Sequence, residues 1–235
     1  MKRLLSPLLL LCLLPQHTQA EVVISGTRII YPQAKRELTL QLNNVGSSPA
    51  LVQSWIDHGD PKVQPEEEQV PFVILPPIVR IEPQQGQNLR ILFSGANTPQ
   101  DRESLFWFNV LEIPPQPEHQ QEINYLQFAV RSRIKLFFRP SGLKADPVQA
   151  AEQLQWHRQG QTLTLSNPGP YHVTLSKVSL NDTELPELAG KMVTPFDTLQ
   201  VSLPNEVAQA RTLNLHFTNI NDFGANDEHQ LKVGG

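Results

Sequence analysis

The sequence predicts an all-β fold made of two sandwich domains. Apolar and polar residues alternate in many short runs, a period of two that is typical of half-buried strands. The chain contains 21 prolines, and several of them end these runs, as expected where strands are joined by turns. No long stretch repeats apolar residues at helical spacing. The 235 residues exceed what one small domain usually needs, so two domains of ordinary size are expected.

The first half of the chain carries a series of closely spaced predicted strands. Residues 36–43 alternate most clearly and are followed by a turn-forming stretch that reaches Pro49. The longest run extends from Tyr125 to Phe138 and ends at Pro140. This spacing is typical of an immunoglobulin-like sandwich. The predicted strands are 22–31, 36–43, 51–56, 78–81, 89–93, 105–113 and 125–138.

A second, smaller β-domain is predicted after a hinge at residues 141–147. The alternation restarts beyond the hinge and soon reaches a strong turn signal at residues 167–170, with the sequence Asn-Pro-Gly-Pro. We therefore expect an N-terminal domain over residues 21–140 and a C-terminal domain over residues 148–235. The predicted strands of the second domain are 162–165, 171–180, 199–203, 212–218 and 229–233.

Residues 1–20 have the pattern of a secretory signal peptide. Lys2 and Arg3 give a positive start, an apolar run follows, and the segment closes on small residues before Glu21. The alternative is a membrane anchor, but a spanning helix needs about 20 apolar residues and this run is about half as long. Cys12 is the only cysteine and would leave with the signal. We therefore expect an exported protein without disulfides that is not embedded in a membrane.

Composition and motifs argue against several classes of function. The formal net charge of −4 lacks the basic excess of a nucleic-acid binder. We find no hydrolase nucleophile elbow, phosphate-binding loop or metalloprotease helix, and the histidines are scattered without ligand spacing. The sequence therefore predicts neither an enzyme, nor a metal site, nor a bound cofactor.

Four motifs in the mature chain resemble the PapD-like periplasmic chaperones of the chaperone–usher pathway. They occur in the family's order and cover both predicted domains. Any one of them is modest evidence, whereas four in register are a specific match. The motifs are Asp-Arg-Glu-Ser-Leu-Phe-Trp-Phe-Asn at 101–109 with Glu-Ile-Pro-Pro at 112–115, Ile-Lys-Leu-Phe-Phe-Arg-Pro at 134–140, Asn-Pro at 167–168 with Pro-Tyr at 170–171, and Ile-Asn-Asp-Phe-Gly at 220–224.

The resemblance implies a boomerang of two immunoglobulin-like domains with a cleft between them. In this family the chaperone binds pilus or fimbrial subunits, lends each incomplete subunit an edge strand, and delivers it to an outer-membrane usher. Adding a strand satisfies the unpaired backbone groups of a sheet edge and fills the exposed groove of the subunit at the same time. We therefore expect a periplasmic, non-enzymatic chaperone that acts by donor-strand complementation.

The resemblance places the lending strand within residues 124–136. Leu126, Phe128 and Val130 would be the alternating apolar residues that enter the groove of the subunit. The pattern alone favours the opposite interpretation, in which the three face the chaperone's own core. The two interpretations predict different consequences for Phe128→Glu, which spares folding only if this side chain is exposed.

The resemblance also assigns two groups of charged residues. Arg28 and Lys135 would grip the C-terminal carboxylate of the subunit through charge-assisted hydrogen bonds, which also fixes the strand register. Glu103, Arg139 and Asp222 would form a charge network that holds the two domains together. Without the family, all five are expected to be solvated surface charges. The position of Lys135 raises a question of parity, because a regular strand points it away from the side of Val130 unless a bulge or twist intervenes.

Three further expectations complete the sequence-based account. The loop at residues 116–122 is short and lacks cysteine, which resembles the branch of the family that builds rigid, adhesin-tipped pili. An exposed apolar strand edge makes self-association of the free chaperone plausible. The main alternative function is an exported two-domain immunoglobulin-like adhesive or structural protein, which would have no need of a cleft carboxylate site. A secreted hydrolase is the weakest alternative.

Overall fold

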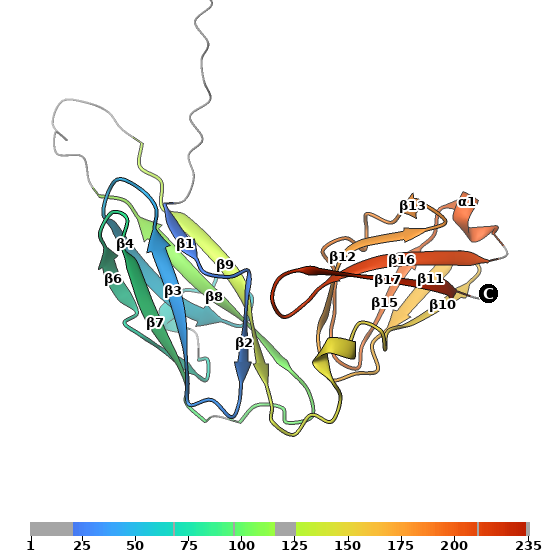
Figure 1. Ribbon diagram of the computed structural model, residues 1–235, viewed down its shortest axis with the longest axis horizontal. Coiled ribbons are helices and arrows are strands. Elements are labelled where there is room, and N and C mark those ends of the chain that lie inside the picture. Colours follow the sequence, from blue (N-terminus) through green and yellow to red (C-terminus); the bar gives the residue numbers. More distant parts are fainter. Residues whose placement is uncertain (1–20, 68, 96, 116–125, 211, 234–235) are drawn as a thin grey trace, which may run out of the picture.

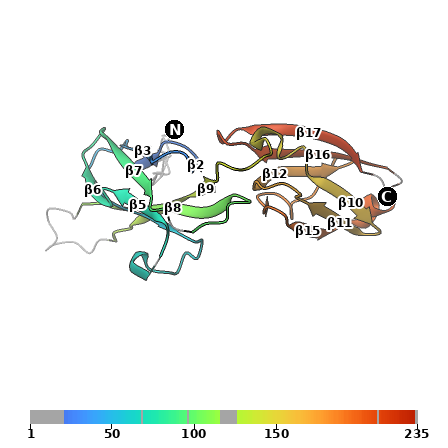
Figure 2. The same ribbon diagram turned by 90° about the horizontal axis from the view of Figure 1, so that it is seen from below.

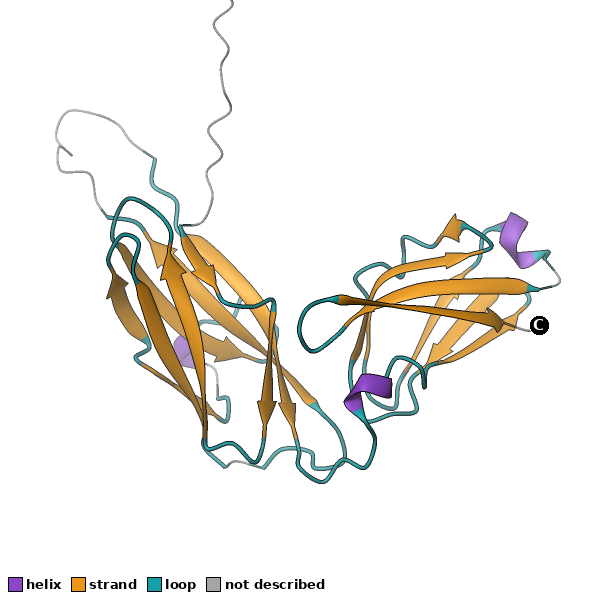
Figure 3. Ribbon diagram, viewed as in Figure 1, coloured by secondary structure: helices purple, strands orange, loops and turns teal. Residues whose placement is uncertain are grey.

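The computed structural model describes residues 21–67, 69–95, 97–115, 126–210 and 212–233. These residues form two β-sandwiches that meet at an angle (Figure 1). Strands dominate both domains, and the helical elements are short turns at Pro65–Glu67, Pro147–Gln149 and Asn205–Ala208 (Figure 3). The prediction of an all-β chain with two sandwiches is confirmed. The predicted signal peptide at residues 1–20 and the short loop at residues 116–122 lie outside the described residues.

The N-terminal sandwich consists of two sheets that enclose one core. One face of each sheet turns its apolar residues inward, and Leu42, Leu89, Ile91, Phe108 and Phe138 are all inaccessible to solvent. The first sheet has the order β1 (Val22–Ile24), β3 (Glu37–Asn44), β7 (Gly86–Phe93) and β5 (Phe72–Leu75). The second has the order β2 (Arg28–Pro32), β9 (Val130–Arg139), β8 (Ser104–Ile113), β4 (Ala50–Asp57) and β6 (Ile78–Ile81).

The prediction of one strand over residues 22–31 is wrong, because the chain changes sheet within this range. β1 pairs with β3 in the first sheet, and β2 pairs with β9 in the second. Gly26 lies between the two strands with a φ of 125°, a conformation that residues with a Cβ rarely adopt. The glycine therefore permits the turn that sends the first strand of the domain from one sheet to the other.

The change of sheet leaves part of β9 unpaired. β2 runs parallel to β9 and pairs with residues 135–139 only. On its other side β9 pairs with β8 along the whole of residues 130–138. No strand in the described part of the chain covers the remaining edge of β9 at residues 130–134. This edge presents free backbone hydrogen-bonding groups.

The longest predicted strand begins five residues later than expected. The prediction starts at Tyr125, whereas β9 starts at Val130, and residues 126–129 are irregular. The pair Glu112–Val130 is the last between β8 and β9. Pro114 and Pro115 follow the end of β8, and a proline has no N–H to donate to a sheet. The ladder therefore stops before it reaches the start of the predicted strand.

The C-terminal sandwich is built in the same way around its own core. Leu163, Leu175, Leu180, Leu213 and Leu215 are inaccessible to solvent within it. One sheet has the order β10 (Gln155–Gln159), β11 (Thr162–Ser166) and β15 (Thr198–Ser202). The other has the order β13 (Thr183–Glu184), β12 (Val173–Leu180), β16 (Leu213–Ile220) and β17 (Asn226–Val233), with β14 (Met192–Val193) also paired to β12.

The two domains meet end to end, and the view from below shows β8 beside the C-terminal domain (Figure 2). The start of β8 pairs there with the end of β9, which also pairs with the end of β2. The loop between β16 and β17, residues 221–225, reaches back toward the N-terminal domain (Figure 1). We call this segment the β16–β17 loop. The junction therefore brings together residues that are far apart in the chain, such as Arg28 and Ile220, which are 192 positions apart.

Candidate functional site in the interdomain cleft

Arg28 and Lys135 lie side by side on neighbouring strands of the N-terminal domain. They are direct register partners on the parallel strands β2 and β9. Alternate residues of a strand point to opposite faces of its sheet, and their neighbours Ile29 and Leu136 are buried in the core. Arg28 and Lys135 therefore both project from the outer face. The structure thus brings together the two cations that the sequence analysis singled out.

The surroundings of these two cations disfavour their charge. Burial lowers the pKa of Lys135 below its ordinary value, and the neighbouring charge of Arg28 lowers it further. Burial also lowers the pKa of Arg28, although Asp222 and Glu103 oppose this shift. Within the described residues neither cation forms an ion pair, and the buried Nε of Arg28 has no hydrogen-bond partner. An anion placed between the two would relieve their repulsion and supply the missing acceptor.

The predicted donor residues are exposed. Leu126 is 78% exposed, Phe128 68% and Val130 40%. Val130 begins β9, while Leu126 and Phe128 precede the strand. None of the three belongs to the core of the N-terminal sandwich. The interpretation that buried them there, which the alternation alone favours, is therefore wrong.

The parity of Lys135 has a simple structural basis. The pairing of β9 with β8 is continuous from residue 130 to residue 138, so no bulge turns the chain over. Leu136 and Phe138 point into the core and Lys135 points outward, as a regular strand requires. Val130 points to the same side of β9 as the core residues Leu136 and Phe138. Only the end of the strand is buried, however, and Val130 at its start is exposed. The cations and the apolar row therefore occupy opposite faces of one strand.

Glu103, Arg139 and Asp222 form one ion-pair network across the domain junction. Arg139 donates from Nε to Glu103 Oε1 at 2.8 Å and from two further nitrogens to Asp222 at 2.7 and 3.0 Å. The side chain of Glu103 is only 2% exposed. Burial opposes the charge of Arg139, but the hydrogen bonds and charges of the two acids outweigh it and raise the pKa of Arg139 well above its ordinary value. Arg139 thus contacts both of the other predicted members.

His172 is a fourth member of this network that sequence reasoning missed. Its backbone N–H donates to Glu103 Oε2 at 2.9 Å, and its ring Nδ1 lies 3.2 Å from the same oxygen. The ring also packs against Phe137, with 5.4 Å between centroids. His172 directly follows the Pro-Tyr motif at residues 170–171, which was the available signal. Glu103 is therefore fully used as an acceptor by groups of both domains.

A second charged cluster on the outer face of the N-terminal domain was also missed. Asp57 is fully buried and accepts from Arg131 at 3.1 Å, from Arg133 at 2.7 Å and from Asn109 at 2.8 Å. The two arginines follow the same outward row of β9 as Lys135. They are already paired with a buried acid, which distinguishes them from Lys135.

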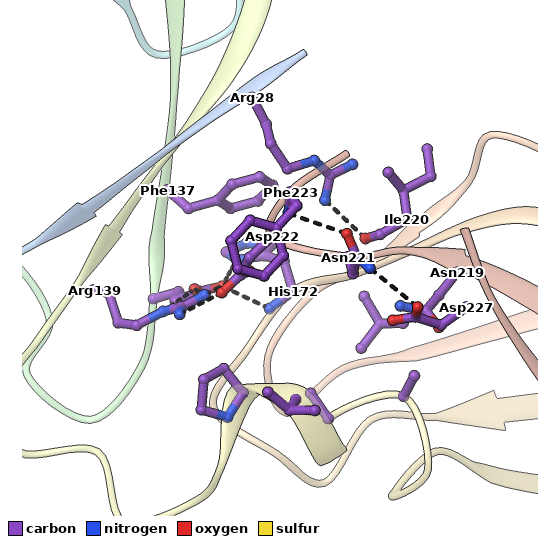
Figure 4. A pocket seen from close by; sticks show the side chains of 16 residues that line it. Arg28, Phe137, Arg139, His172, Asn219, Ile220, Asn221, Asp222, Phe223 and Asp227 are labelled. Atoms are coloured by element: carbon purple, nitrogen blue, oxygen red, sulfur yellow. Dashed lines mark hydrogen bonds and ion pairs between the residues drawn. The ribbon is translucent and has the colours of Figure 1, made fainter. Parts of the chain in front are cut away.

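A pocket between the domains adjoins Arg28 (Figure 4). Figure 4 shows Arg28 and Phe137 from the N-terminal domain facing the β16–β17 loop of the C-terminal domain. Arg28 donates from Nη1 to the carbonyl oxygen of Ile220 at 2.8 Å. Phe223, at the tip of the loop, is 94% exposed. The cleft is thus lined by groups of both domains.

Comparisons with known proteins match this architecture over nearly the whole described chain. Residues 21–144 match the family model for the N-terminal domain of PapD, a pili and flagellar-assembly chaperone, and residues 149–231 match the model for the C-terminal domain of the pili assembly chaperone PapD. The chain belongs to the PapD-like pilus-assembly chaperones. It is a periplasmic chaperone and not an enzyme.

Individual PapD-like chaperones resemble the chain along most of their length. The probable fimbrial chaperone YadV of Escherichia coli K12 is 40% identical over 222 residues, which are 91% of this chain and 90% of YadV. The crystal structure of the Pseudomonas aeruginosa CupB2 chaperone is 38% identical, with a TM-score of 0.76 over 90% of this chain and 100% of CupB2. The Salmonella enterica SafB chaperone, solved in complex with the SafA pilin, is 29% identical, with a TM-score of 0.76 over 92% of this chain and 97% of the matched chain.

Two further findings bear on the class of protein. In the described part of the chain, no group of three or more His, Cys, Asp or Glu side chains is arranged to hold a metal ion. None of the described helices has the length and apolar character needed to cross a membrane.

Proposed function

We propose that this chaperone binds pilus subunits by donor-strand complementation through the free edge of β9. The observation that carries the proposal is the unpaired edge at residues 130–134, which continues into the exposed apolar residues Leu126, Phe128 and Val130. A subunit strand placed along this edge would pair with its free backbone groups, and the apolar row would enter the subunit core. The SafB chaperone, which shares this fold, was solved in complex with a pilin.

Arg28 and Lys135 would bind the C-terminal carboxylate of the subunit. They lie next to the lending edge, on the strand pair that ends it. Neither has an ion-pair partner in the described residues, and burial lowers the pKa of both. A carboxylate at this point fixes where the subunit strand starts, and register decides which side chains face the groove. Glu103, Arg139 and Asp222 would hold the cleft in shape.

Membership of the family supports a proposal for the rest of the pathway. Residues 1–20 would direct export and be removed, the N-terminal domain of residues 21–140 would lend the strand, and the domain of residues 148–235 would follow a hinge at 141–147. The chaperone would pass its subunit to an outer-membrane usher. We assign it to the short-loop branch of the family, and in the absence of a subunit we expect it to cover its exposed edge by self-association.

Periplasmic co-expression tests the proposal. A candidate fimbrial subunit is expressed with the full chain, and the chaperone is pulled down. We expect the subunit to co-purify, and we expect a subunit lacking its C-terminal strand to be lost. Capture of both forms would contradict strand lending, because binding would then involve another surface. Failure to capture any fimbrial subunit, combined with binding to host sugars or proteins, would favour the adhesive alternative.

A further inference from the structure

The anchor cation Arg28 is held in place by a backbone carbonyl of the other domain. Its Nη1 donates to the oxygen of Ile220 at 2.8 Å, and the Cζ atom lies 5.7 Å from the centroid of Phe137. Ile220 is the last residue of β16 and leads into the β16–β17 loop. The direction of the Arg28 side chain therefore depends on where this loop sits.

The β16–β17 loop is a stiff unit. The side-chain oxygen of Asn221 accepts from the backbone N–H groups of Phe223 and Ala225, both at 3.0 Å. The backbone of Asn221 closes the turn, since its N–H donates to Ala225 at 2.8 Å and its carbonyl accepts from Gly224 at 3.0 Å. The amide of Asn221 also donates to Asp227 at 3.0 Å. A loop with this many internal bonds moves as one piece.

The loop rests on the N-terminal domain through Gly224. This residue has a φ of 82°, and a Cβ atom built on it would lie 2.3 Å from Oγ1 of Thr27. Thr27 directly precedes Arg28. A side chain at residue 224 therefore displaces either the loop or the residue next to the anchor, in addition to its backbone strain.

We infer that Gly224 is a positioning residue for subunit binding: its close contact with Thr27 seats the β16–β17 loop so that the Ile220 carbonyl aims Arg28 at the subunit carboxylate. The inference rests on the proposed function and deepens it. It makes the carboxylate anchor, which belongs to the N-terminal domain, depend on a contact with the C-terminal domain.

The test compares three variants of the full chain. Gly224→Ala introduces both the clash and the strain. The double variant Gly224→Ala with Thr27→Ala keeps the strain but removes Oγ1, so the nearest remaining atom is Cβ of residue 27 at 3.6 Å. Gly190→Ala is the matched control, because Gly190 has a φ of 76° in the C-terminal domain with nothing within 4 Å of its Cβ position.

The first readout needs no subunit. Phenylglyoxal modification of each arginine is followed by mass spectrometry, with the exposed Arg80 as internal reference. We expect Gly224→Ala to raise the modification rate of Arg28 relative to Arg80, and we expect the double variant to restore it. Gly190→Ala should leave the rate unchanged. An unchanged Arg28 rate in Gly224→Ala would overturn the inference.

The second readout distinguishes a misdirected Arg28 side chain from a general loss of the fold. Its probe is the C-terminal peptide of the co-purifying subunit, made with a free carboxylate and with an amide. We expect Gly224→Ala to reduce the preference for the carboxylate by about tenfold, with recovery in the double variant. Equal weakening of both peptides, or no rescue by Thr27→Ala, would contradict a positioning role. If the unmodified chaperone binds neither peptide, the proposed function fails, and the modification rate alone still decides whether Gly224 positions Arg28.

Discussion

Arg28 and Lys135 are register partners on two parallel strands, so two cations leave the same face of one sheet side by side. Burial disfavours the charge of each of them, and neither forms an ion pair within the described residues. Two partly buried, unpaired cations raise the free energy of the folded chaperone. We expect a bound anion to offset this cost. This pair is therefore the basis of our proposal that the two cations bind an anion rather than form a structural ion pair.

Replacing either cation should abolish subunit capture while sparing the fold. A hydrogen bond to a charged group contributes about 1.5–3 kcal/mol, so Lys135→Ala or Arg28→Ala should weaken binding at least about tenfold. The melting temperature should change little, because burial already disfavours these charges. Arg80→Ala, which removes an exposed cation on β6, serves as the control. Undiminished co-purification of subunit with Lys135→Ala would refute the anchor.

A charged substitution among the predicted donor residues should not reduce the stability of the free chaperone. Phe128 is 68% exposed, so Phe128→Glu should leave the free chaperone folded. The same variant should lose its subunit, because a carboxylate would have to enter the subunit core without a partner. Circular dichroism melting and pull-down measure the two effects. As the matched control, Phe108→Glu places the same charge at a fully buried position and should unfold the domain. Unfolding of Phe128→Glu as well would show that residue 128 belongs to the core in solution.

The domain-junction network should matter for stability. Arg139→Ala leaves Glu103 buried without its cation, and breaking a buried pair in this way costs about 3–5 kcal/mol. Arg80→Ala is the control, since Arg80 and its partner Glu82 are both exposed and such surface pairs contribute little to stability. Thermal melting reports stability and small-angle scattering reports the angle between the domains. Unchanged melting and unchanged scattering of Arg139→Ala would rule out this role.

Subunit affinity should fall at alkaline pH. The pKa of Lys135 lies below its ordinary value of 10.5 in the folded chaperone, so the lysine loses its charge at a lower pH than in the unfolded chain. Between these two pKa values the unfolded chain holds more protons, and the folded state therefore becomes more stable as pH rises through this window. Carboxylate binding needs the charged lysine and weakens over the same range. Titration calorimetry of subunit binding across that pH range measures the loss of affinity.

Lys135→Arg provides the control for this pH dependence. Arginine stays charged throughout the alkaline range, so the variant should retain whatever affinity it has as pH rises. If Lys135→Arg and the unmodified chaperone lose affinity in parallel, another group is responsible, and Lys135 does not contact the carboxylate.

The local features of this structure could be predicted from the sequence. Alternation located most strands, because a residue's choice of face depends on its immediate neighbours. It misjudged Leu126 and Phe128, because whether an apolar residue is buried depends on what covers it, and β8 ends before reaching them. It also joined β1 and β2, although the polar residues 25–28, which include Gly26, interrupt the apolar residues of the two strands.

The site itself depends on contacts between distant parts of the chain. Arg28 and Lys135, and likewise Glu103, Arg139 and Asp222, came from the family resemblance, and no local pattern would have paired them. His172 and the contact of Gly224 with Thr27 were not foreseen at all. They join residues of different domains, and only the angle at which the two sandwiches meet brings them together.

Amide hydrogen exchange along β9 tests strand lending most directly. The backbone of residues 126–134 has a free edge in the described chain, and a captured subunit is proposed to pair with it. Exchange is measured for the chaperone alone, kept dilute to limit self-association, and for the purified chaperone–subunit complex. The account predicts strong new protection within residues 126–134 in the complex. A complex in which these amides exchange as fast as in the free chaperone, with protection elsewhere, would contradict it.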